Sequence, residues 1–323
     1  MIISKTPYRI PLTGGGTDLD FYYKKKEGEL FSLAINQYVY VHLHNREIDR
    51  NYLIQTTKTE FCKNIKNINH ELIRETLKFF SLKEKLHVAT YSTVPTQTGL
   101  GSSSAMVVGL INCINTLKNL DLTDRQIINF AFKIERKICK QYGGWQDQII
   151  SQYGGLLKIN ISKKEKIAVK KINLSKLMTN KIKNHFLLVY TQKKRDSAKI
   201  ALSQKKRKSQ IIKHYDKIKN LNNNLLYSLR NKSPKYIAQL FNKHWEIKKK
   251  LSNQMSDSAI NSLYSKLRNN FNFFGGKLIG AGGGGFFLMI SPNKKKTISL
   301  LRKDGIAFID FQIEKSGSKI IER

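Results

Sequence analysis

Cysteine, proline and long apolar runs are all scarce in this sequence. Its three cysteines, Cys62, Cys113 and Cys139, are widely spaced and form no CxxC pair. This pattern argues against a disulfide framework or a cysteine-rich zinc site and fits a reducing compartment. No stretch approaches the ~18 apolar residues of a membrane span, and a proline and charges interrupt the N-terminus early. We therefore expect a soluble, cytoplasmic protein with no membrane partner.

Acidic residues are scarce as well. The 323 residues include 23 Asp+Glu against 58 Lys+Arg, a formal net charge of +35, and residues 161–323 hold 37 of the basic but only 9 of the acidic residues. Such a field favours anionic partners such as phosphorylated metabolites, nucleic acid or anionic lipid. Lysines on solvated surfaces explain the same composition. The basic runs at 205–208 and 248–250 lack interleaved aromatic residues, so nucleic-acid binding is kept only as the alternative from another function class.

Glycine clusters, rather than the five prolines, punctuate the chain. They lie at 14–16, 99–101 and 280–285. Glycine runs are costly in conformational entropy, so they indicate sharp turns or places where the backbone approaches a ligand closely.

The apolar spacing predicts a mixture of helices and strands. Strands are expected at 38–43, 52–57, 86–92 and 186–191, and helices at 71–80 and, fully buried, at 105–117. A capping-box pattern at Thr123 predicts a helix that ends before Gly143. Lysine-rich helices to about residue 270 follow, and strands alternate with a helix over 277–313. We predict an α+β protein of two domains with a boundary near 172–184.

The segment 95–105 combines two glycines with three serines and leads into the predicted buried helix. Free N–H groups of the helix start, hydroxyls and the positive end of the helix dipole converge there and form an anion site. The segment matches neither the Walker pattern nor GxGxxG. A plain turn with one serine as helix cap is the alternative, but one cap needs only one hydroxyl. The expected phosphate-binding residues are Gly99, Leu100, Gly101, Ser102, Ser103 and Ser104.

Two carboxylates are candidates for chemistry, and each has an ordinary alternative. Glu135 lies at the margin of an apolar helix face, where a carboxylate needs a partner, or it is an edge residue that reaches water or pairs with a lysine. Asp147 follows two glycines and is placed to accept a proton from a substrate hydroxyl. Local sequence alone favours Asp147 as the cap of a short helix running toward Tyr153.

The N-terminal segment 7–18 places Arg9 on a strand that enters a glycine turn. The turn ends in a hydroxyl and a carboxylate, and short polar groups on bare backbone suit a polyhydroxylated ligand. The candidate ligand-binding residues are Gly14, Gly15, Gly16, Thr17 and Asp18.

Taken in order, the segments 7–18, 99–105 and 277–285 resemble the GHMP kinase superfamily over the whole chain. The unbroken 14–18 turn and the segment 143–148 look most like its D-glycero-D-manno-heptose 7-phosphate kinase group, with fucokinases as near relatives. The resemblance implies the two-domain α+β fold of that family. It implies a ribosomal-protein-S5-like α/β domain at 1–178, a ferredoxin-like α+β domain at 179–323, and an active site in the cleft between them.

The resemblance also implies the catalytic and metal-binding residues. Asp147 matches the catalytic base or hydroxyl orienter, and Arg9 matches the basic residue that steadies the reacting groups. Ser103 and Glu135 match residues that hold Mg²⁺, and the glycine-serine loop matches the segment that wraps the ATP phosphates.

The sugar site is implied in the same way. Thr17 and Asp18 match positions that hydrogen-bond sugar hydroxyls, and Gly282 and Gly283 match the loop that shapes the floor of the cleft. Arg195 matches the arginine of a Thr-Gly-x-x-Arg pattern, although Gln192 replaces the glycine of that pattern in this sequence.

The expected function is therefore an ATP- and Mg²⁺-dependent sugar kinase. The resemblance implies phosphorylation of the anomeric C1 hydroxyl of D-glycero-D-manno-heptose 7-phosphate to the 1,7-bisphosphate. That product would serve the synthesis of nucleotide-activated heptose for a bacterial surface polysaccharide. An anomeric kinase for an unphosphorylated sugar such as fucose is the alternative. The discriminating feature would be a basic cluster at the far end of the sugar, for which Lys193, Lys194 and Arg195 are candidates.

Overall fold

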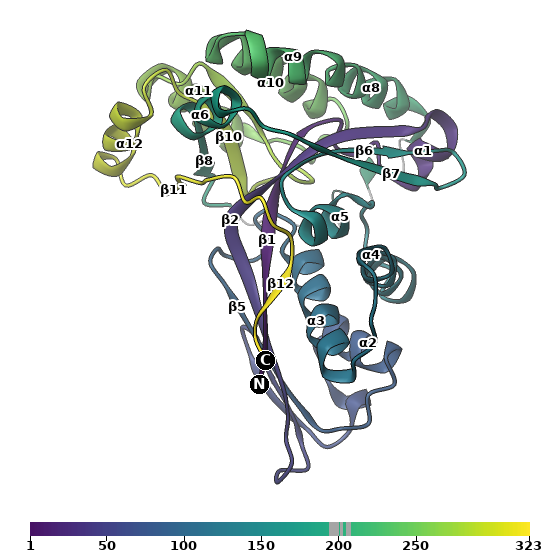
Figure 1. Cartoon of the computed structure of the whole chain (residues 1–323). Coiled ribbons are helices and arrows are strands. Elements are labelled where there is room, and N and C mark those ends of the chain that lie inside the picture. Colours follow the sequence, from purple (N-terminus) through teal and green to yellow (C-terminus); the bar gives the residue numbers. More distant parts are fainter. Residues whose placement is uncertain (194–199, 201–202, 205–207) are drawn as a thin grey trace.

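The computed structural model describes residues 1–193, 200, 203–204 and 208–323. Two sheets organise these residues (Figure 1). The larger sheet has the strand order β12-β1-β2-β5-β3-β4, and β6 and β7 extend it from β2. Its strands are β1 (Ile2–Thr13), β2 (Gly28–Asn45), β3 (Tyr52–Gln55), β4 (Thr59–Cys62), β5 (Leu86–Ser92), β6 (Leu156–Ile161), β7 (Ile167–Ile172) and β12 (Lys319–Glu322).

The long strand β2 connects the two ends of this sheet. Its first residues pair with β6, its last residues pair with β5, and β1 runs antiparallel along most of its length. The register places Arg9 opposite Ala34, in the middle of the molecule. A bulge between Pro7 and Tyr8 shifts the register just before Arg9.

Helices cover one face of this sheet (Figure 1). The central helix α3 packs on β1 and β2 and is buried along most of its length, as its all-round apolar sequence predicts. Gly109 permits this contact, because a Cβ there would lie 2.8 Å from both the Ser4 and the Thr6 hydroxyl oxygens. The first-half helices are α1 (Asp20–Lys26), η1 (Ile65–Asn67), α2 (Glu71–Phe79), α3 (Ser102–Lys118), α4 (Asp124–Phe132), the π-helical turn η2 (Lys133–Ile138) and α5 (Gln146–Tyr153).

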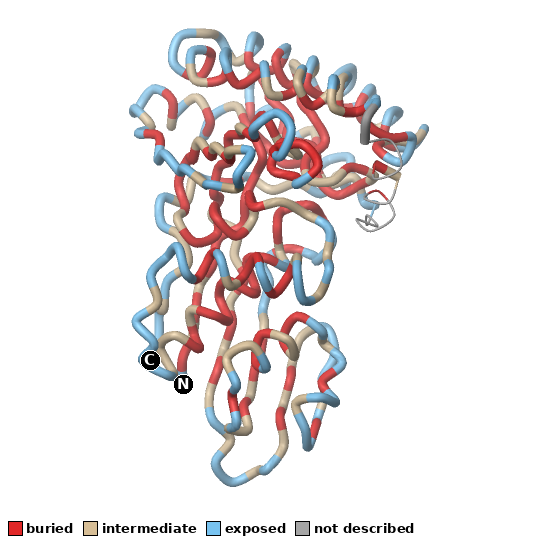
Figure 2. The backbone as a smooth tube through the Cα atoms, turned by 90° about the vertical axis from the view of Figure 1, so that its right-hand side faces the viewer, coloured by how far each residue is buried: buried red, intermediate tan, exposed pale blue. Residues whose placement is uncertain are grey.

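The second half forms a smaller antiparallel sheet of order β11-β8-β10-β9 beneath a layer of helices. Figure 2 shows these helices with buried inner faces and exposed outer faces. The strands are β8 (Phe186–Tyr190), β9 (Gly275–Leu278), β10 (Phe286–Ile290) and β11 (Phe308–Ile309). The helices are α6 (Lys176–His185), α8 (Lys208–Asn220), α9 (Asn222–Asn231), α10 (Pro234–Lys249), α11 (Ser258–Asn270) and α12 (Lys294–Lys303).

The two halves share a hydrophobic core. One cluster of buried side chains includes Leu33 and Ile111 of the first half as well as Phe186 and Phe286 of the second. The C-terminal strand β12 returns to pair with β1, so the two chain ends lie close together (Figure 1). The predicted division after residue 178 falls inside α6, and the position of a domain boundary remains a prediction.

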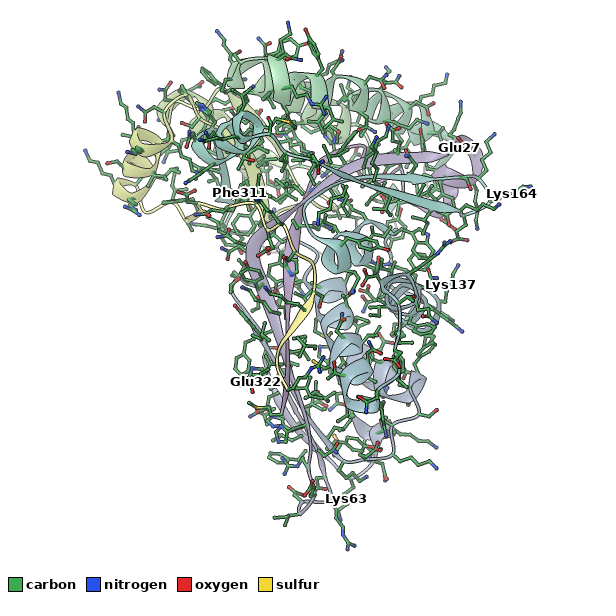
Figure 3. The ribbon with its side chains drawn as sticks, in the orientation of Figure 1. Glu27, Lys63, Lys137, Lys164, Phe311 and Glu322 are labelled. Atoms are coloured by element: carbon green, nitrogen blue, oxygen red, sulfur yellow. The ribbon has the colours of Figure 1, made fainter. Side chains whose placement is uncertain are left out.

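Many of the lysines that produce the high net charge lie on solvated surfaces. Lys63, Lys137 and Lys164 are exposed and extend outward from the ribbon (Figure 3). Lys248 and Lys277 are exceptions, since both are buried in the second half.

Candidate active site

Arg9 and Asp147 form a two-pronged ion pair at the centre of the molecule. The Arg9 Nε donates to Asp147 Oδ1 and its Nη2 donates to Asp147 Oδ2, each at 2.8 Å. The Arg9 side chain is 6% exposed, whereas that of Asp147 is 21% exposed. Two parallel bonds to a charged guanidinium fix the plane of the carboxylate, and the partial exposure leaves it open to a ligand.

The same arginine ties the glycine-serine loop to this carboxylate. Its Nη1 donates to the Gly99 carbonyl at 2.5 Å, and its backbone N–H donates to the Leu100 carbonyl at 3.1 Å. Gly101 then begins α3 with a φ of 84°, a left-handed conformation that glycine adopts readily. The predicted anion site therefore lies directly beside Asp147.

The start of α3 has no side-chain cap. Gly101 occupies the N-cap position, so Ser102 is not the helix cap that the ordinary alternative required. The first amides of the helix have no intrahelical partners and carry the positive end of its dipole, which suits an anion. Asp147 is likewise not a cap, because Trp145 is the N-cap residue of α5 and Asp147 lies in the first turn with its carboxylate on Arg9.

Glu135 lies fully buried opposite the serines of this loop. The Ser103 hydroxyl donates to Glu135 Oε1 at 3.0 Å, and Gln148 Nε2 donates to Glu135 Oε2 at 2.5 Å. Gln148 also reaches the Ser104 hydroxyl at 3.2 Å, and so does Arg136 at 3.4 Å. Glu135 is thus not an edge residue that reaches water.

A π-helical turn brings Glu135 to this position. The predicted helix from Thr123 begins with the expected capping box, but after Phe132 it widens, and the Cys139 N–H bonds to the Ile134 carbonyl five residues earlier. Such turns are frequent at functional sites. Neither the capping box nor the apolar spacing distinguishes this turn from a continued α-helix.

The glycine turn after β1 surrounds Asp18 with backbone. Asp18 accepts from the N–H groups of Gly16 and Gln146, each at 3.1 Å, and Gly144 leaves no room for a side chain because a Cβ there would lie 2.1 Å from Asp18 Oδ2. Burial raises the pKa of Asp18, and the charge of Asp147 acts in the same direction. This carboxylate is therefore linked electrostatically to the Arg9–Asp147 pair.

Thr17, Gly16 and Gly15 of this turn differ in how tightly they are packed. The Thr17 hydroxyl is fully buried and donates to the carbonyls of Gly14 and Glu29, so it holds the turn together. Gly16 packs against the Tyr215 ring, whereas a Cβ on Gly15 would meet nothing nearer than 3.6 Å. The backbone at Gly15 is the open part of the turn.

The C-terminal glycine loop reaches the same place from the second half. A Cβ on Gly285 would lie 2.1 Å from the Thr98 carbonyl oxygen, so this loop packs directly on the segment that precedes Gly99. Gly282 and Gly283 instead contact Met255, Gln254 and Ile200. The predicted residue Arg195 lies outside the described residues.

Sequence reasoning missed Lys277 and Gln148 as site-related residues. Lys277 is 1% exposed, and its pKa lies well below its usual value because of burial first and then the charges of Lys248 and Arg9. Gln148 directly follows Asp147 and donates to Glu135. Its place in the 143–148 motif is the sequence feature that could have identified it as a site residue.

Comparisons with known proteins identify the family of this chain. A family model of the GHMP kinases N terminal domain matches residues 64–155. The chain is 30% identical over 336 residues to D-glycero-alpha-D-manno-heptose 7-phosphate kinase of Campylobacter jejuni, covering 98% of each chain. This chain belongs to the GHMP kinase family.

Two further relatives are more distant. Mevalonate kinase of Methanocaldococcus jannaschii is 28% identical over 236 residues, which cover 72% of this chain and 70% of that protein. The crystal structure of a D-glycero-D-manno-heptose 1-phosphate kinase from Bacteroides thetaiotaomicron superposes with a TM-score of 0.81 at 21% identity, covering 100% of this chain and 99% of the other.

As a GHMP kinase, the protein has the expected α+β fold of that family and uses ATP to phosphorylate a small molecule. The sequence-based family assignment is confirmed. None of the helices in the described part of the chain combines the length and apolar character that a bilayer crossing needs.

Proposed function

We propose that this GHMP kinase transfers the γ-phosphoryl group of ATP to the anomeric C1 hydroxyl of D-glycero-D-manno-heptose 7-phosphate, giving the 1,7-bisphosphate. The observation that carries the proposal is the Arg9 bridge between the Asp147 carboxylate and the Gly99 carbonyl. It sets an acceptor for a proton beside a helix start that attracts phosphate. The Campylobacter jejuni relative, a D-glycero-alpha-D-manno-heptose 7-phosphate kinase, supports the choice of sugar.

Phosphoryl transfer needs positioning and charge neutralisation more than covalent help from the protein. The ATP phosphates bind the amides that begin α3, over the loop of Gly99, Leu100, Gly101, Ser102, Ser103 and Ser104. The sugar oxygen forms a bond to the γ-phosphorus while the bond to the ADP oxygen breaks. Asp147 receives or directs the hydroxyl proton through a lone pair that Arg9 does not occupy.

The metal would be Mg²⁺, which prefers oxygen ligands and retains few protein ligands in nucleotide complexes. The Ser103 hydroxyl and the Glu135 carboxylate fit it, since both are oxygen donors and lie 3.0 Å apart beside the phosphate loop. When bound, the ion neutralises phosphate charge. Gln148 would keep the Glu135 carboxylate oriented toward the loop.

The sugar would lie against the glycine turn after β1. Gly14, Gly15 and Gly16 offer backbone without side chains, and Gly15, where an added Cβ would meet nothing nearer than 3.6 Å, is the least crowded of the three. Asp18 would face the sugar hydroxyls from the turn, while Thr17 would hold the turn in shape. Gly282 and Gly283 would form the cleft floor, and Arg195 is kept as a substrate-binding candidate on its sequence motif alone.

The test is ADP release measured with the heptose 7-phosphate, with the free heptose and with fucose. We expect turnover that depends on the heptose 7-phosphate and a kcat/KM at least about tenfold lower for both unphosphorylated sugars, because one charge-assisted phosphate contact contributes about 1.5–3 kcal/mol. Preference for fucose would support the unphosphorylated-sugar alternative, for which the bifunctional fucokinase/GDP-fucose pyrophosphorylase of Arabidopsis thaliana, 24% identical over 225 residues, is a precedent. No ADP release with the heptose 7-phosphate would remove the substrate assignment.

A further inference from the structure

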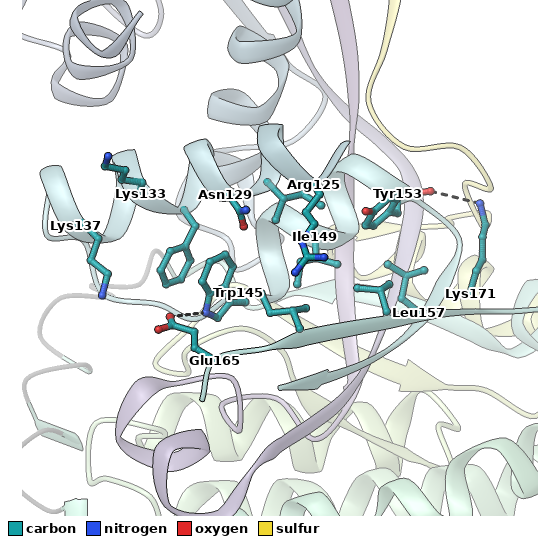
Figure 4. A pocket seen from close by; sticks show the side chains of 14 residues that line it. Arg125, Asn129, Lys133, Lys137, Trp145, Ile149, Tyr153, Leu157, Glu165 and Lys171 are labelled. Atoms are coloured by element: carbon teal, nitrogen blue, oxygen red, sulfur yellow. Dashed lines mark hydrogen bonds between the residues drawn. The ribbon is translucent and has the colours of Figure 1, made fainter. Parts of the chain in front are cut away.

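A cavity lies against the two elements that carry the site carboxylates, η2 with Glu135 and α5 with Asp147. It has a volume of about 830 Å³ and opens between α4 with η2, helix α5, and the β6–β7 hairpin. Figure 4 shows the 14 side chains that line it. The volume falls in the range of roughly 300–1,000 Å³ that is usual for small-molecule sites. None of the residues assigned above to ATP, metal or sugar lines this cavity.

The floor of the cavity is apolar and partly aromatic. The Phe132 and Trp145 rings stack with centroids 3.4 Å apart and an interplanar angle of 2°. Ile149 of α5 and Leu157 of β6 also line the cavity but are fully buried, whereas Val169 of β7, 37% exposed, is an apolar lining side chain that faces solvent. A flat or apolar group placed here would be removed from water by the rings and the aliphatic side chains.

The rim of the cavity is cationic. Arg125, Lys133, Lys137 and Lys171 line it and are exposed, and no carboxylate of the described residues forms an ion pair with any of them. The one acidic lining residue is Glu165, which already accepts from Trp145 Nε1 at 3.2 Å and from the Tyr23 hydroxyl at 2.8 Å. The charge offered to a ligand is therefore positive.

We propose that this cavity binds a small aromatic anion of the nucleotide class. Its base would lie over the apolar floor beside the Phe132–Trp145 stack, and its phosphate would lie at the cationic rim, to which Arg125 and Lys137 both contribute. An aromatic floor favours a planar group, and exposed cations without a carboxylate partner favour phosphate. Lys171 contributes least, because it already donates to the carbonyls of Lys315 and Tyr153. A neutral apolar ligand would leave these cations unused, and a cationic ligand would be repelled by them.

The cavity is coupled to the active site through its walls, and this second part rests on the proposed roles of Asp147 and Glu135. Trp145 is the N-cap residue of α5, two positions before Asp147, and Phe132 directly precedes the π-helical turn that contains Glu135. A ligand that packs beside this stack and moves either ring would therefore shift the first turn of α5, which holds Asp147, or the π-helical turn, which holds Glu135. Occupancy would change kcat without touching ATP or sugar.

The binding test uses 8-anilinonaphthalene-1-sulfonate, an aromatic anion whose fluorescence rises in apolar surroundings. It is titrated into the full-length protein saturated with a nonhydrolysable ATP analogue, so that the ATP site is filled. The test variant is Arg125→Glu/Lys137→Glu, and the matched control is Lys63→Glu/Lys243→Glu, which reverses two exposed charges on elements that do not line the cavity.

We expect the dye to bind the wild type and the control with dissociation constants within twofold, and the test variant at least tenfold more weakly. Guanosine diphosphate should displace the dye from the wild type while the ATP analogue stays bound. Equal dye affinity in all three proteins, or loss of the dye when the analogue binds, would overturn the site. A lower sedimentation coefficient in the test variant than in the wild type would also overturn the site. It would mean that a second copy of the chain covers the cavity in the wild type.

Coupling is measured separately, as kcat at saturating ATP and sugar with and without guanosine diphosphate. A change of at least twofold in the wild type that is absent in the test variant supports coupling, and an unchanged kcat with bound ligand refutes it. Binding is measured without turnover, so a failure of the proposed sugar specificity would leave the binding result intact.

Discussion

Arg9 and Asp147 stand 138 positions apart in the sequence, yet two bonds of 2.8 Å join the guanidinium of one to both carboxylate oxygens of the other. The third donor of the same guanidinium holds Gly99, so strand β1 positions the phosphate loop and the acidic residue together. This relationship is the basis of the proposed transfer from a nucleotide to a hydroxyl.

Replacing Asp147 with asparagine should lower kcat by about 10²–10⁴-fold, because the amide cannot take up the hydroxyl proton. The ATP KM should change less than about threefold, since Asp147 is not assigned to the nucleotide. Steady-state kinetics of Asp147→Asn and of the exposed control Asp121→Asn check this. Undiminished turnover in the first variant would mean that another group receives the proton.

Arg9→Lys tests the two-pronged bridge while keeping the positive charge. A lysine cannot make two parallel bonds to Asp147 and a third to Gly99, so both the carboxylate plane and the loop lose a fixed position. We expect kcat to fall about 10–100-fold and the ATP KM to rise. An effect on kcat alone would show that the contact to the loop is not needed for ATP binding.

Glu135→Gln should raise the Mg²⁺ concentration for half-maximal rate about tenfold or more, because a neutral amide is a poor ligand for a hard cation. The exposed Glu47→Gln serves as control. Metal titrations at saturating ATP give the comparison, and thermal unfolding of both variants shows whether the buried network around Gln148 survives. Identical metal curves would exclude Glu135 as a ligand.

Gly285→Ala should separate the two glycine loops, since the new methyl group would lie 2.1 Å from the Thr98 carbonyl. Gly305→Ala is the matched control: Gly305 also has a positive φ, +64°, but nothing lies within 4 Å of its added Cβ. The control should lose roughly 1–2 kcal/mol of unfolding free energy from the backbone conformation alone. Gly285→Ala should lose more and should raise the ATP KM. Equal losses would show that the loop contact is dispensable.

Lys277→Met tests the buried lysine near Arg9 through the pH dependence of stability. The lowered pKa means that the folded protein binds fewer protons than the unfolded chain between that pKa and 10.5. Wild-type stability should therefore rise with pH across this interval by up to about 1.4 kcal/mol per unit from this group. Lys277→Met lacks this contribution. In urea unfolding, the free energy of unfolding of the wild type should therefore rise relative to that of the variant from pH 7 toward pH 10. A constant difference would place an ordinary, charged lysine at position 277.

Local patterns predicted much of the fold. The capping box at Thr123, the all-round apolar helix and the strand at 86–92 need only short-range information, and the structure contains all three. The strand expected at 52–57 ends at Gln55, which is the usual uncertainty of an element boundary. The return of β12 to β1 and the extension of the sheet by β6 and β7 depend on long-range pairing, which no local pattern encodes.

The candidate site was predicted better by spaced motifs than by single residues. Local sequence alone favoured Asp147 as a helix cap, because the residue that occupies its carboxylate, Arg9, lies on a distant strand. Glu135 was ambiguous for the same reason, since only the π-helical turn aims it at Ser103. Lys277 was missed as a charged group in the core because burial is a property of the whole fold.

The most direct measurement is a crystal structure of the protein with a nonhydrolysable ATP analogue and D-glycero-D-manno-heptose 7-phosphate. The account predicts phosphate oxygens within hydrogen-bond distance of the backbone amides of Ser102, Ser103 and Ser104, and the C1 hydroxyl on the Asp147 carboxylate. A nucleotide bound elsewhere, or a sugar whose C1 hydroxyl lies out of reach of Asp147, would contradict it.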